Sequence, residues 1–194
     1  MRVPKWVLVA GITTAVTLGA GTSWADSGGG GKGNGGGKVV RMVDECDPKT
    51  FNAALRQIVC VGDGDVTFGE FVAALNLQVG GHHDWKFEDS SLDMKSGGTL
   101  HVVNNGGETH SFTEVTTFGK TSSPPLPNAG IAALLNGALP ANAPLATPID
   151  PSPTGLRFVL AGGSIDVAGL TDGTHRFQCM IHPWMRSTVT VGGN

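Results

Sequence analysis

Short runs in which hydrophobic and polar residues alternate dominate the chain after Gly80. They are rich in Val, Thr and Phe, and Gly, Asn or Asp residues separate them. The runs are WKFED, TLHVVN, HSFTEVTTF, LRFVLA, GSIDVAGL, THRFQCM and STVTV. A period of two with turn residues between the runs predicts short strands, and about seven such strands predict a β-sandwich.

Residues 39–80 have a different pattern, which predicts a small helical appendage. Asp47 can cap a helix and Pro48 suits its first position, because the N–H that proline lacks would have no partner there. Thr67 and Glu70 have the spacing of a capping box at the start of a second short helix. We therefore expect two short helices ahead of the strands.

A long loop insertion is predicted within the sandwich domain, which we place at residues 81–194. Eight of the eleven prolines fall between Lys120 and Thr154, and proline is excluded from central strands because it cannot donate a ladder hydrogen bond. The stretch NAGIAALLNGAL within this loop can form a short helix. The expected fold class is all-β, with an N-terminal helical appendage and a long Pro-rich loop.

The first 25 residues have the features of an export signal. Arg2 and Lys5 precede an apolar run, and small residues before Asp26 offer a cleavage point. An uncleaved membrane anchor is the alternative, but the run is short and diluted by Gly and Thr. The Gly-rich residues 26–38 should then be a flexible linker. We expect a periplasmic or secreted protein with no stable membrane insertion after cleavage.

The charge of the exported chain makes nucleic acid a poor partner. The sequence has 13 basic and 16 acidic residues. Loss of the signal removes two basic residues, which leaves 11 against 16 and a net charge of −5. A negatively charged chain is repelled by the phosphate backbone.

Two of the three cysteines fall in the predicted appendage. Disulfides form in oxidising compartments, so Cys46 and Cys60 of an exported chain are candidates for one. A straight helix over residues 47–59 would hold the two roughly 20 Å apart, far beyond the reach of a disulfide. The disulfide therefore requires the helix to stop near Leu55 and the chain to double back. Cys179 would then be the unpaired thiol.

The stretch FQCMIHPWM places three metal-binding groups in the loop between the last two predicted strands. Cys179, His182 and Met185 have the spacing CxxHxxM. Thiolate, imidazole and thioether suit copper, which cycles between Cu(I) and Cu(II), and a His₂Cys set with a weak axial Met is the blue-copper arrangement. The second histidine is predicted to be His110, because it follows a Gly-rich turn at a strand end. These four residues are the predicted copper ligands.

Other metal sites fit the sequence less well. A CxxH pair can be half a zinc site, but no second close pair with zinc-finger spacing exists and Met is a poor zinc ligand. Residues 63–70 are similar to the second half of an EF-hand calcium loop. The first and third calcium ligands would be Val59 and Val61, which have no side-chain oxygen.

The chain resembles the cupredoxins over residues 84 to 192. NNGGETHSF is similar to the segment that carries the first histidine ligand in plastocyanin-like proteins, and CMIHPWM resembles the ligand loop of amicyanin. The resemblance implies a Greek-key sandwich that binds one type 1 copper. It also implies an electron carrier rather than an enzyme, one that passes single electrons between redox partner proteins.

Two positions depart from the family pattern. The family commonly has Asn after the first histidine and Ser or Thr after the cysteine, and their hydrogen bonds help to hold the two ligand segments together. This chain has Ser111 and Met180 there.

The electron port is predicted to be an exposed edge of His182, among Pro183 and Trp184.

Two other functions remain open at this point. A copper-holding or copper-delivery protein could use the same ligands. A mononuclear copper enzyme could have an open site in which Glu108 or Glu114, near His110, becomes a ligand. Oxidase or nitrite-reductase chemistry is disfavoured because it needs another metal centre, for which the sequence has no second histidine cluster.

Overall fold

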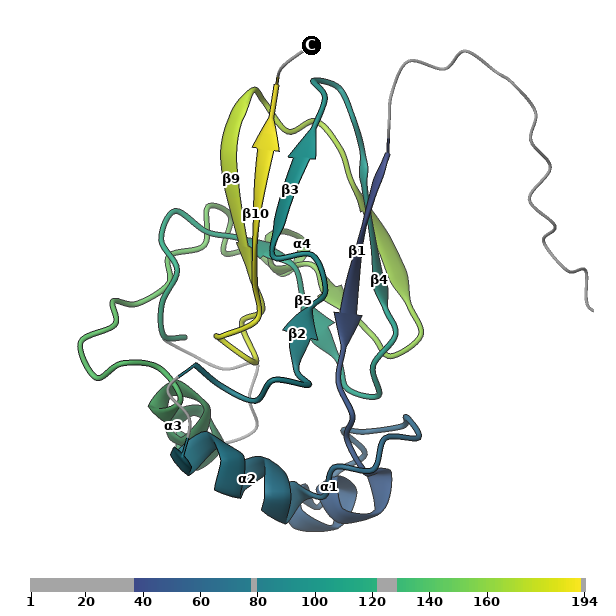
Figure 1. Ribbon diagram of the computed structural model, residues 1–194, viewed down its shortest axis with the longest axis vertical. Coiled ribbons are helices and arrows are strands. Elements are labelled where there is room, and N and C mark those ends of the chain that lie inside the picture. The colour runs from purple at the N-terminus through teal and green to yellow at the C-terminus, as the bar shows by residue number, and fades with distance from the viewer. Residues whose placement is uncertain (1–36, 78–79, 122–128, 193–194) are drawn as a thin grey trace, which may run out of the picture. The chain divides into compact units, whose positions relative to one another are not determined.

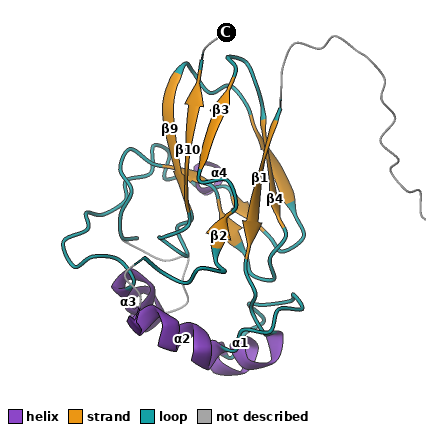
Figure 2. Cartoon of the chain, viewed as in Figure 1, coloured by secondary structure: helices purple, strands orange, loops and turns teal. Residues whose placement is uncertain are grey.

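The computed structural model describes residues 37–77, 80–121 and 129–192, and Figures 1 and 2 show their arrangement. The strands are β1 (Lys38–Val43), β2 (Lys86–Phe87), β3 (Ser91–Met94), β4 (Leu100–Asn104), β5 (His110–Ser111), β6 (Thr113–Glu114), β7 (Phe158–Val159), β8 (Ser164–Val167), β9 (Gly173–Gln178) and β10 (Arg186–Val191). The helices are α1 (Pro48–Leu55), α2 (Phe68–Leu77), α3 (Ala129–Gly137) and α4 (Pro153–Leu156). The predicted export signal, residues 1–25, and most of the predicted linker, residues 26–38, lie outside the described residues.

The strands form two four-stranded sheets and one short two-stranded sheet. Their orders are β2-β1-β4-β8, β3-β10-β9-β6 and β5-β7. The pairs β1·β4 and β3·β10 are parallel, and the other pairs are antiparallel. One cluster of buried side chains includes Val102 of β4 and Val189 of β10, so both larger sheets contribute to the same core. This is the β-rich, two-layer arrangement that the alternating runs predict.

Strand β1 corrects the predicted boundary of the helical appendage, which the sequence pattern sets at residues 39–80. Val40 and Met42 are fully buried while Arg41 between them is exposed, which is the period of a strand. The strand pairs with β4, more than fifty residues further along the chain. The sequence alone does not show this partner. Because β1 pairs with β4, residues 38–43 belong to the sandwich.

The two predicted helices are confirmed, and local capping explains where each begins. The Asp47 carboxylate accepts hydrogen bonds from two backbone N–H groups at the start of α1, which ends at Leu55 as the disulfide requires. The Glu70 carboxylate accepts from the N–H of Thr67 at 2.9 Å, and the Thr67 hydroxyl accepts from the N–H of Glu70 at 3.3 Å. This reciprocal pair is the capping box of α2.

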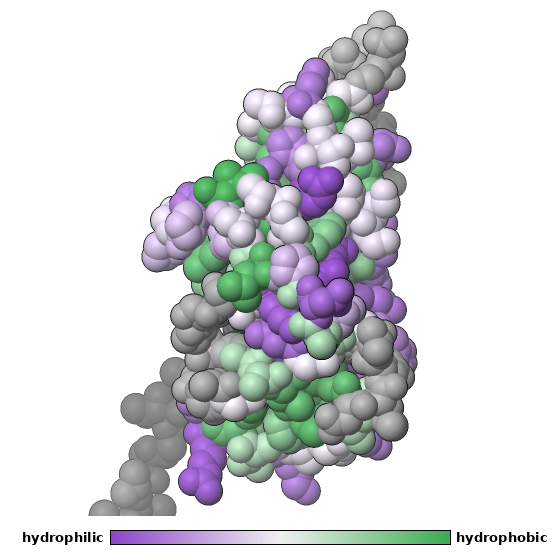
Figure 3. All heavy atoms as spheres, turned by 90° about the vertical axis from the view of Figure 1, so that its left-hand side faces the viewer, coloured by the Kyte–Doolittle hydropathy of each residue, from purple (hydrophilic) through white to green (hydrophobic). Residues whose placement is uncertain are grey.

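The helices pack on the sandwich through aromatic side chains. Trp85, just before β2, is fully buried and lies 5.8 Å from the ring of Phe51 in α1 and 4.6 Å from that of Phe71 in α2. The predicted short helix of the Pro-rich loop is α3, while residues 122–128 of that loop lie outside the described residues. Figure 3 shows hydrophobic side chains gathered over the helical part of the molecule. No described helix has both the length and the hydropathy needed to cross a membrane.

Candidate metal centre

Three of the four predicted ligands converge in the structure. Nδ1 of His110 lies 3.9 Å from Sγ of Cys179 and 3.3 Å from Nδ1 of His182. The third side, from Sγ of Cys179 to Nδ1 of His182, is 4.0 Å. All three side chains are buried. We call these three atoms the donor triangle.

The donor triangle has the dimensions of a metal site. The point equidistant from its three atoms lies about 2.2 Å from each, which matches typical metal–nitrogen and metal–sulfur bonds of about 2.0 to 2.3 Å. Two imidazoles and one thiolate are the trigonal ligands of a blue-copper centre. The residues present therefore fit a copper ion by both distance and chemistry.

Backbone hydrogen bonds fix the loop that carries Cys179 and His182. Cys179 directly follows β9, and its N–H donates to the carbonyl of Met185 at 3.0 Å. The N–H of Met185 donates to the carbonyl of His182 at 2.9 Å. The loop therefore closes on itself, with Met185 buried in the same core cluster as Cys179. That its thioether is an axial ligand stays a prediction.

Ser111 joins the two ligand segments, although it departs from the family pattern. Its hydroxyl accepts a hydrogen bond from the N–H of Met180 at 2.8 Å. Its own N–H points to Sγ of Cys179 at 3.4 Å, as does the N–H of His182, also at 3.4 Å. Two N–H donors therefore face the sulfur, which stabilises its thiolate form and holds it in place.

Asp44, which the sequence analysis missed, orients His110. Its carboxylate is fully buried, and Oδ2 accepts a hydrogen bond from Nε2 of His110 at 2.8 Å. Such a carboxylate behind a ligand histidine fixes the tautomer and directs the other ring nitrogen toward the metal. The same carboxylate accepts from the N–H groups of Cys46, Gly107 and Glu108. Asp44 thus ties the end of β1 to the turn that precedes His110.

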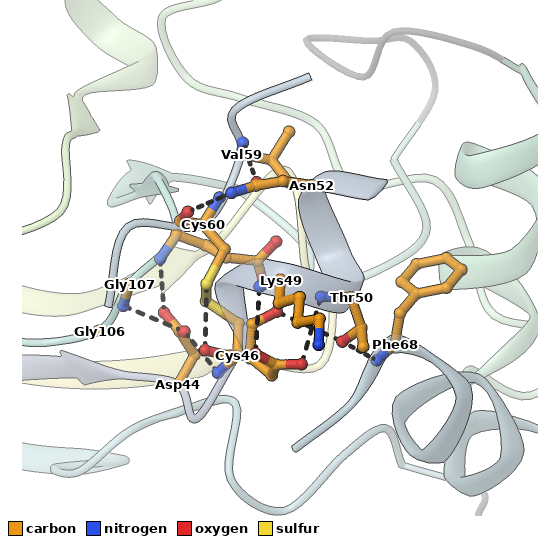
Figure 4. Close-up of a disulfide and its surroundings, with 12 residues drawn as sticks. Asp44, Cys46, Lys49, Thr50, Asn52, Val59, Cys60, Phe68, Gly106 and Gly107 are labelled. Atoms are coloured by element: carbon orange, nitrogen blue, oxygen red, sulfur yellow. Dashed lines mark hydrogen bonds between the residues drawn. A yellow bond between two sulfur atoms is a disulfide. The ribbon is translucent and has the colours of Figure 1, made fainter. Parts of the chain in front are cut away.

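The predicted disulfide between Cys46 and Cys60 is present and supports this arrangement (Figure 4). It closes a loop that returns along the Gly106–Gly107 turn, where the N–H of Val61 donates to the carbonyl of Gly107 at 2.9 Å. A Cβ at Gly107 would lie only 2.7 Å from Sγ of Cys46, so this approach requires glycine. Cys179 is the free cysteine of the described chain.

The exposed edge of His182 that was predicted as the electron port is not present, because the ring is only 3% exposed. Phe71 of α2 lies 6.4 Å from its ring and Trp184 lies 5.5 Å from it. Nε2 of His182 faces the Glu108 carboxylate at 3.4 Å, and the N–H of the Trp85 indole holds that carboxylate at 2.6 Å. The sequence placed His182 in a surface loop, but Phe71 of α2, from another part of the chain, packs against its ring.

The two carboxylates that could be copper ligands in an enzyme, those of Glu108 and Glu114, have partners away from the centre of the donor triangle. Glu108 meets His182 at Nε2, on the side of the ring opposite the donor triangle. Glu114 pairs with His175, whose Nδ1 is 2.6 Å from the carboxylate. Neither contact brings a carboxylate oxygen to the centre of the triangle.

The charges in the site favour a thiolate. Burial raises the pKa of the Cys179 thiol, but His110 and His182 together bring it well below its usual value. Burial lowers the pKa of His182, but its contacts with Cys179 and Glu108 raise it to about 10. Burial also raises the pKa of Asp44, which His110 nevertheless lowers. The site therefore holds negative charge on sulfur and on Asp44. Protonated histidines balance this charge, since the pKa of His110 is raised as well, and a metal cation would displace a proton from each ring when it binds.

A pocket of about 290 Å³ lies beside the centre. Hydrophobic side chains of α1, α2 and α3 line it, together with Glu108 and His182. It gives a route by which the covered edge of His182 can be approached.

Solved cupredoxin structures are similar to this chain at low identity. A purple cupredoxin from Nitrosopumilus maritimus is 14% identical with a TM-score of 0.38, over 80% of this chain and 99% of that one. An amicyanin variant in the Cu(I) state is 18% identical with a TM-score of 0.33, over 55% of this chain and 72% of that one. A reduced amicyanin variant is 20% identical, with a TM-score of 0.32. No protein-family model and no curated protein matches the chain.

The sheet order and the donor triangle come from the chain itself, and they are consistent with a cupredoxin-like β-sandwich with a His-Cys-His metal site.

Proposed function

We propose that this chain is an exported blue copper protein that binds one type 1 copper and transfers single electrons between redox partner proteins. The observation that carries the proposal is the donor triangle of His110, Cys179 and His182. Met185 would supply the weak axial ligand. When bound, copper would supply the one-electron Cu(I)/Cu(II) couple.

The residues around the triangle support electron transfer because their contacts hold the three ligands in place. Asp44 fixes His110, Ser111 fixes the Cys179 segment, and Glu108 fixes His182. Fixed ligands have little reorganisation to undergo when the charge changes by one. The enclosed position keeps water away from the donor atoms.

The route for the electron would pass through the aromatic side chains that cover His182. Trp184 is half-buried and lies next to both His182 and Phe71. A redox partner protein would dock over this area rather than on the His182 ring itself.

The disulfide supports export to the periplasm or beyond, because disulfides persist in oxidising compartments. The expected negative charge after signal removal leaves no role for nucleic acid.

A visible absorption spectrum of the copper-loaded full chain tests the proposal. We expect an intense charge-transfer band that a one-electron reductant bleaches at one equivalent per protein. Lack of an intense band in the Cu(II) form would contradict the type 1 assignment. A coloured protein that turns over a substrate at an exchangeable copper position would contradict the carrier role.

A further inference from the structure

A second group of metal-binding side chains lies on the loop between α2 and β2. His82, His83 and Asp84 each offer one ligand atom, and these atoms lie within 4.8 Å of one another. Oδ2 of Asp84 lies 3.6 Å from Nδ1 of His82 and 3.2 Å from Nε2 of His83. The group shares no residue with the donor triangle, and it corrects the expectation from the sequence that there is no second histidine cluster.

Packing holds the inner ligand of this group. His82 is only 5% exposed, and its ring lies 5.7 Å from the ring of Phe71 and 4.7 Å from that of Trp85. The carbonyl of His82 accepts from the N–H of Trp85 at 3.2 Å, which closes the turn. Gly81, which precedes His82, has a φ of +83°. Its backbone lies so close to the ring of Trp184 that a Cβ at this position would clash with the ring.

The outer two ligands are open to solvent. The side chain of His83 is 73% exposed and that of Asp84 is 28% exposed. The rings of His82 and His83 are nearly parallel, with centroids 5.0 Å apart, and both reach the same carboxylate oxygen. A rigid inner ligand with two accessible outer ligands is an arrangement that a cation can enter from water.

The chemistry of the group selects the kind of cation. Two imidazoles and one carboxylate bind borderline divalent transition metals, and three protein ligands plus water complete a tetrahedral zinc site. We propose that His82, His83 and Asp84 form a second metal site, which binds a divalent cation of the Zn²⁺ type with water in the remaining position. The long contact from the N–H of Asp84 to Nδ1 of His82, 3.3 Å, would give way to the metal bond.

A simple pair of charges is the alternative, and the chain contains a matched example of one. His101 lies 2.7 Å from Asp166, and both are well exposed. That pair has one imidazole and one carboxylate with no second histidine. If residues 82–84 form a metal site, substitutions within it should weaken metal binding. A substitution of His101 should leave metal binding unchanged.

Zinc titration calorimetry on the copper-loaded full chain tests the site. We expect one saturable Zn²⁺ site whose affinity falls at least about tenfold in His83→Ala and stays unchanged in His101→Ala. Asp84→Asn should weaken binding in the same way, and circular dichroism of each variant checks that it folds. Unchanged zinc affinity in His83→Ala, or no saturable binding to the wild type, would overturn the inference.

The test is independent of the proposed copper function. The visible band is recorded on every sample before zinc is added. If no band forms, the donor triangle is free to take zinc as well, and the wild type should then show one more high-affinity zinc site than His83→Ala. The copper proposal would fail in that case, while the second site would still be counted separately.

Discussion

Asp44 and His110 form a buried pair in which the carboxylate and Nε2 of the ring are 2.8 Å apart. The contact occupies one ring nitrogen and leaves Nδ1 directed at Cys179 and His182. The geometry of the metal centre therefore depends on a residue that directly follows the first strand of the described chain.

Replacement of Asp44 should weaken copper binding. Asp44→Asn keeps an acceptor for the neighbouring backbone N–H groups but loses the charge that orients His110. We expect copper affinity to fall about 10- to 100-fold, as measured by competition with a chelator. Asp166→Asn, which changes an exposed carboxylate beside His101, is the control. Equal affinity in Asp44→Asn and wild type would show that Asp44 does not support the site.

Substitutions at the two sulfur ligands should have different effects. Cys179→Ser should abolish the intense visible band, because the band requires a thiolate bound to copper. Met185→Leu should keep the colour and shift the reduction potential, as expected for a weak axial ligand. Met180→Leu is a matched control, since Met180 is a buried methionine that packs in a separate cluster with Val115. A potential that shifts equally in both methionine variants would contradict the axial role.

The disulfide should be detectable and stabilising. Thiol labelling of the unfolded, copper-free protein should modify Cys179 alone. Replacing both Cys46 and Cys60 by Ala should lower the free energy of unfolding by about 3 kcal/mol, the value for a closed loop of this length. Chemical denaturation measures the change. Labelling at three cysteines would contradict the pairing.

The pair of His175 and Glu114 should make stability depend on pH. Burial lowers the pKa of His175, but the Glu114 carboxylate raises it above its usual value of about 6.5. The pair therefore contributes fully to the free energy of unfolding below about pH 6.5. It loses this contribution as pH rises through the raised pKa of His175. His175→Asn should lower the melting temperature more at about pH 5.5 than at about pH 8.5.

The control for this pH experiment is His101→Asn, whose partner Asp166 is well exposed and screened by solvent. It should show a smaller difference between the two pH values. If His175→Asn lowers the melting temperature equally at both pH values, this would argue against a charged pair of His175 and Glu114.

Features that depend on neighbouring residues could be predicted from the sequence. Asp47 and Glu70 cap helices through bonds that span three residues or fewer, so local spacing is sufficient to identify them. Cys179 and His182 lie three residues apart in one loop. His110 was predictable because a Gly-rich turn placed it at a strand end.

Features that depend on distant segments were missed. The run KVVRMV alternates like a strand, but its pairing with β4 requires a partner more than fifty residues away. The role of Asp44 follows from that pairing. A carboxylate at the end of an alternating run and two residues before a cysteine was the only local sign of it. The burial of His182 depends on Phe71, which a helix brings from more than a hundred residues earlier.

The spacing of the site along the chain also determines when it can form. Asp44 and His110 are 66 positions apart, and His110 and His182 are a further 72 apart. Parallel pairing of β1 with β4 and of β3 with β10 adds more contacts between distant segments, and such contacts form slowly during folding. We therefore expect the complete donor triangle to form late in folding, with metal uptake following it. During that interval the Cys179 thiol is still accessible to Cys46 and Cys60, and early closure of their short loop would protect the chain from pairing the wrong cysteines.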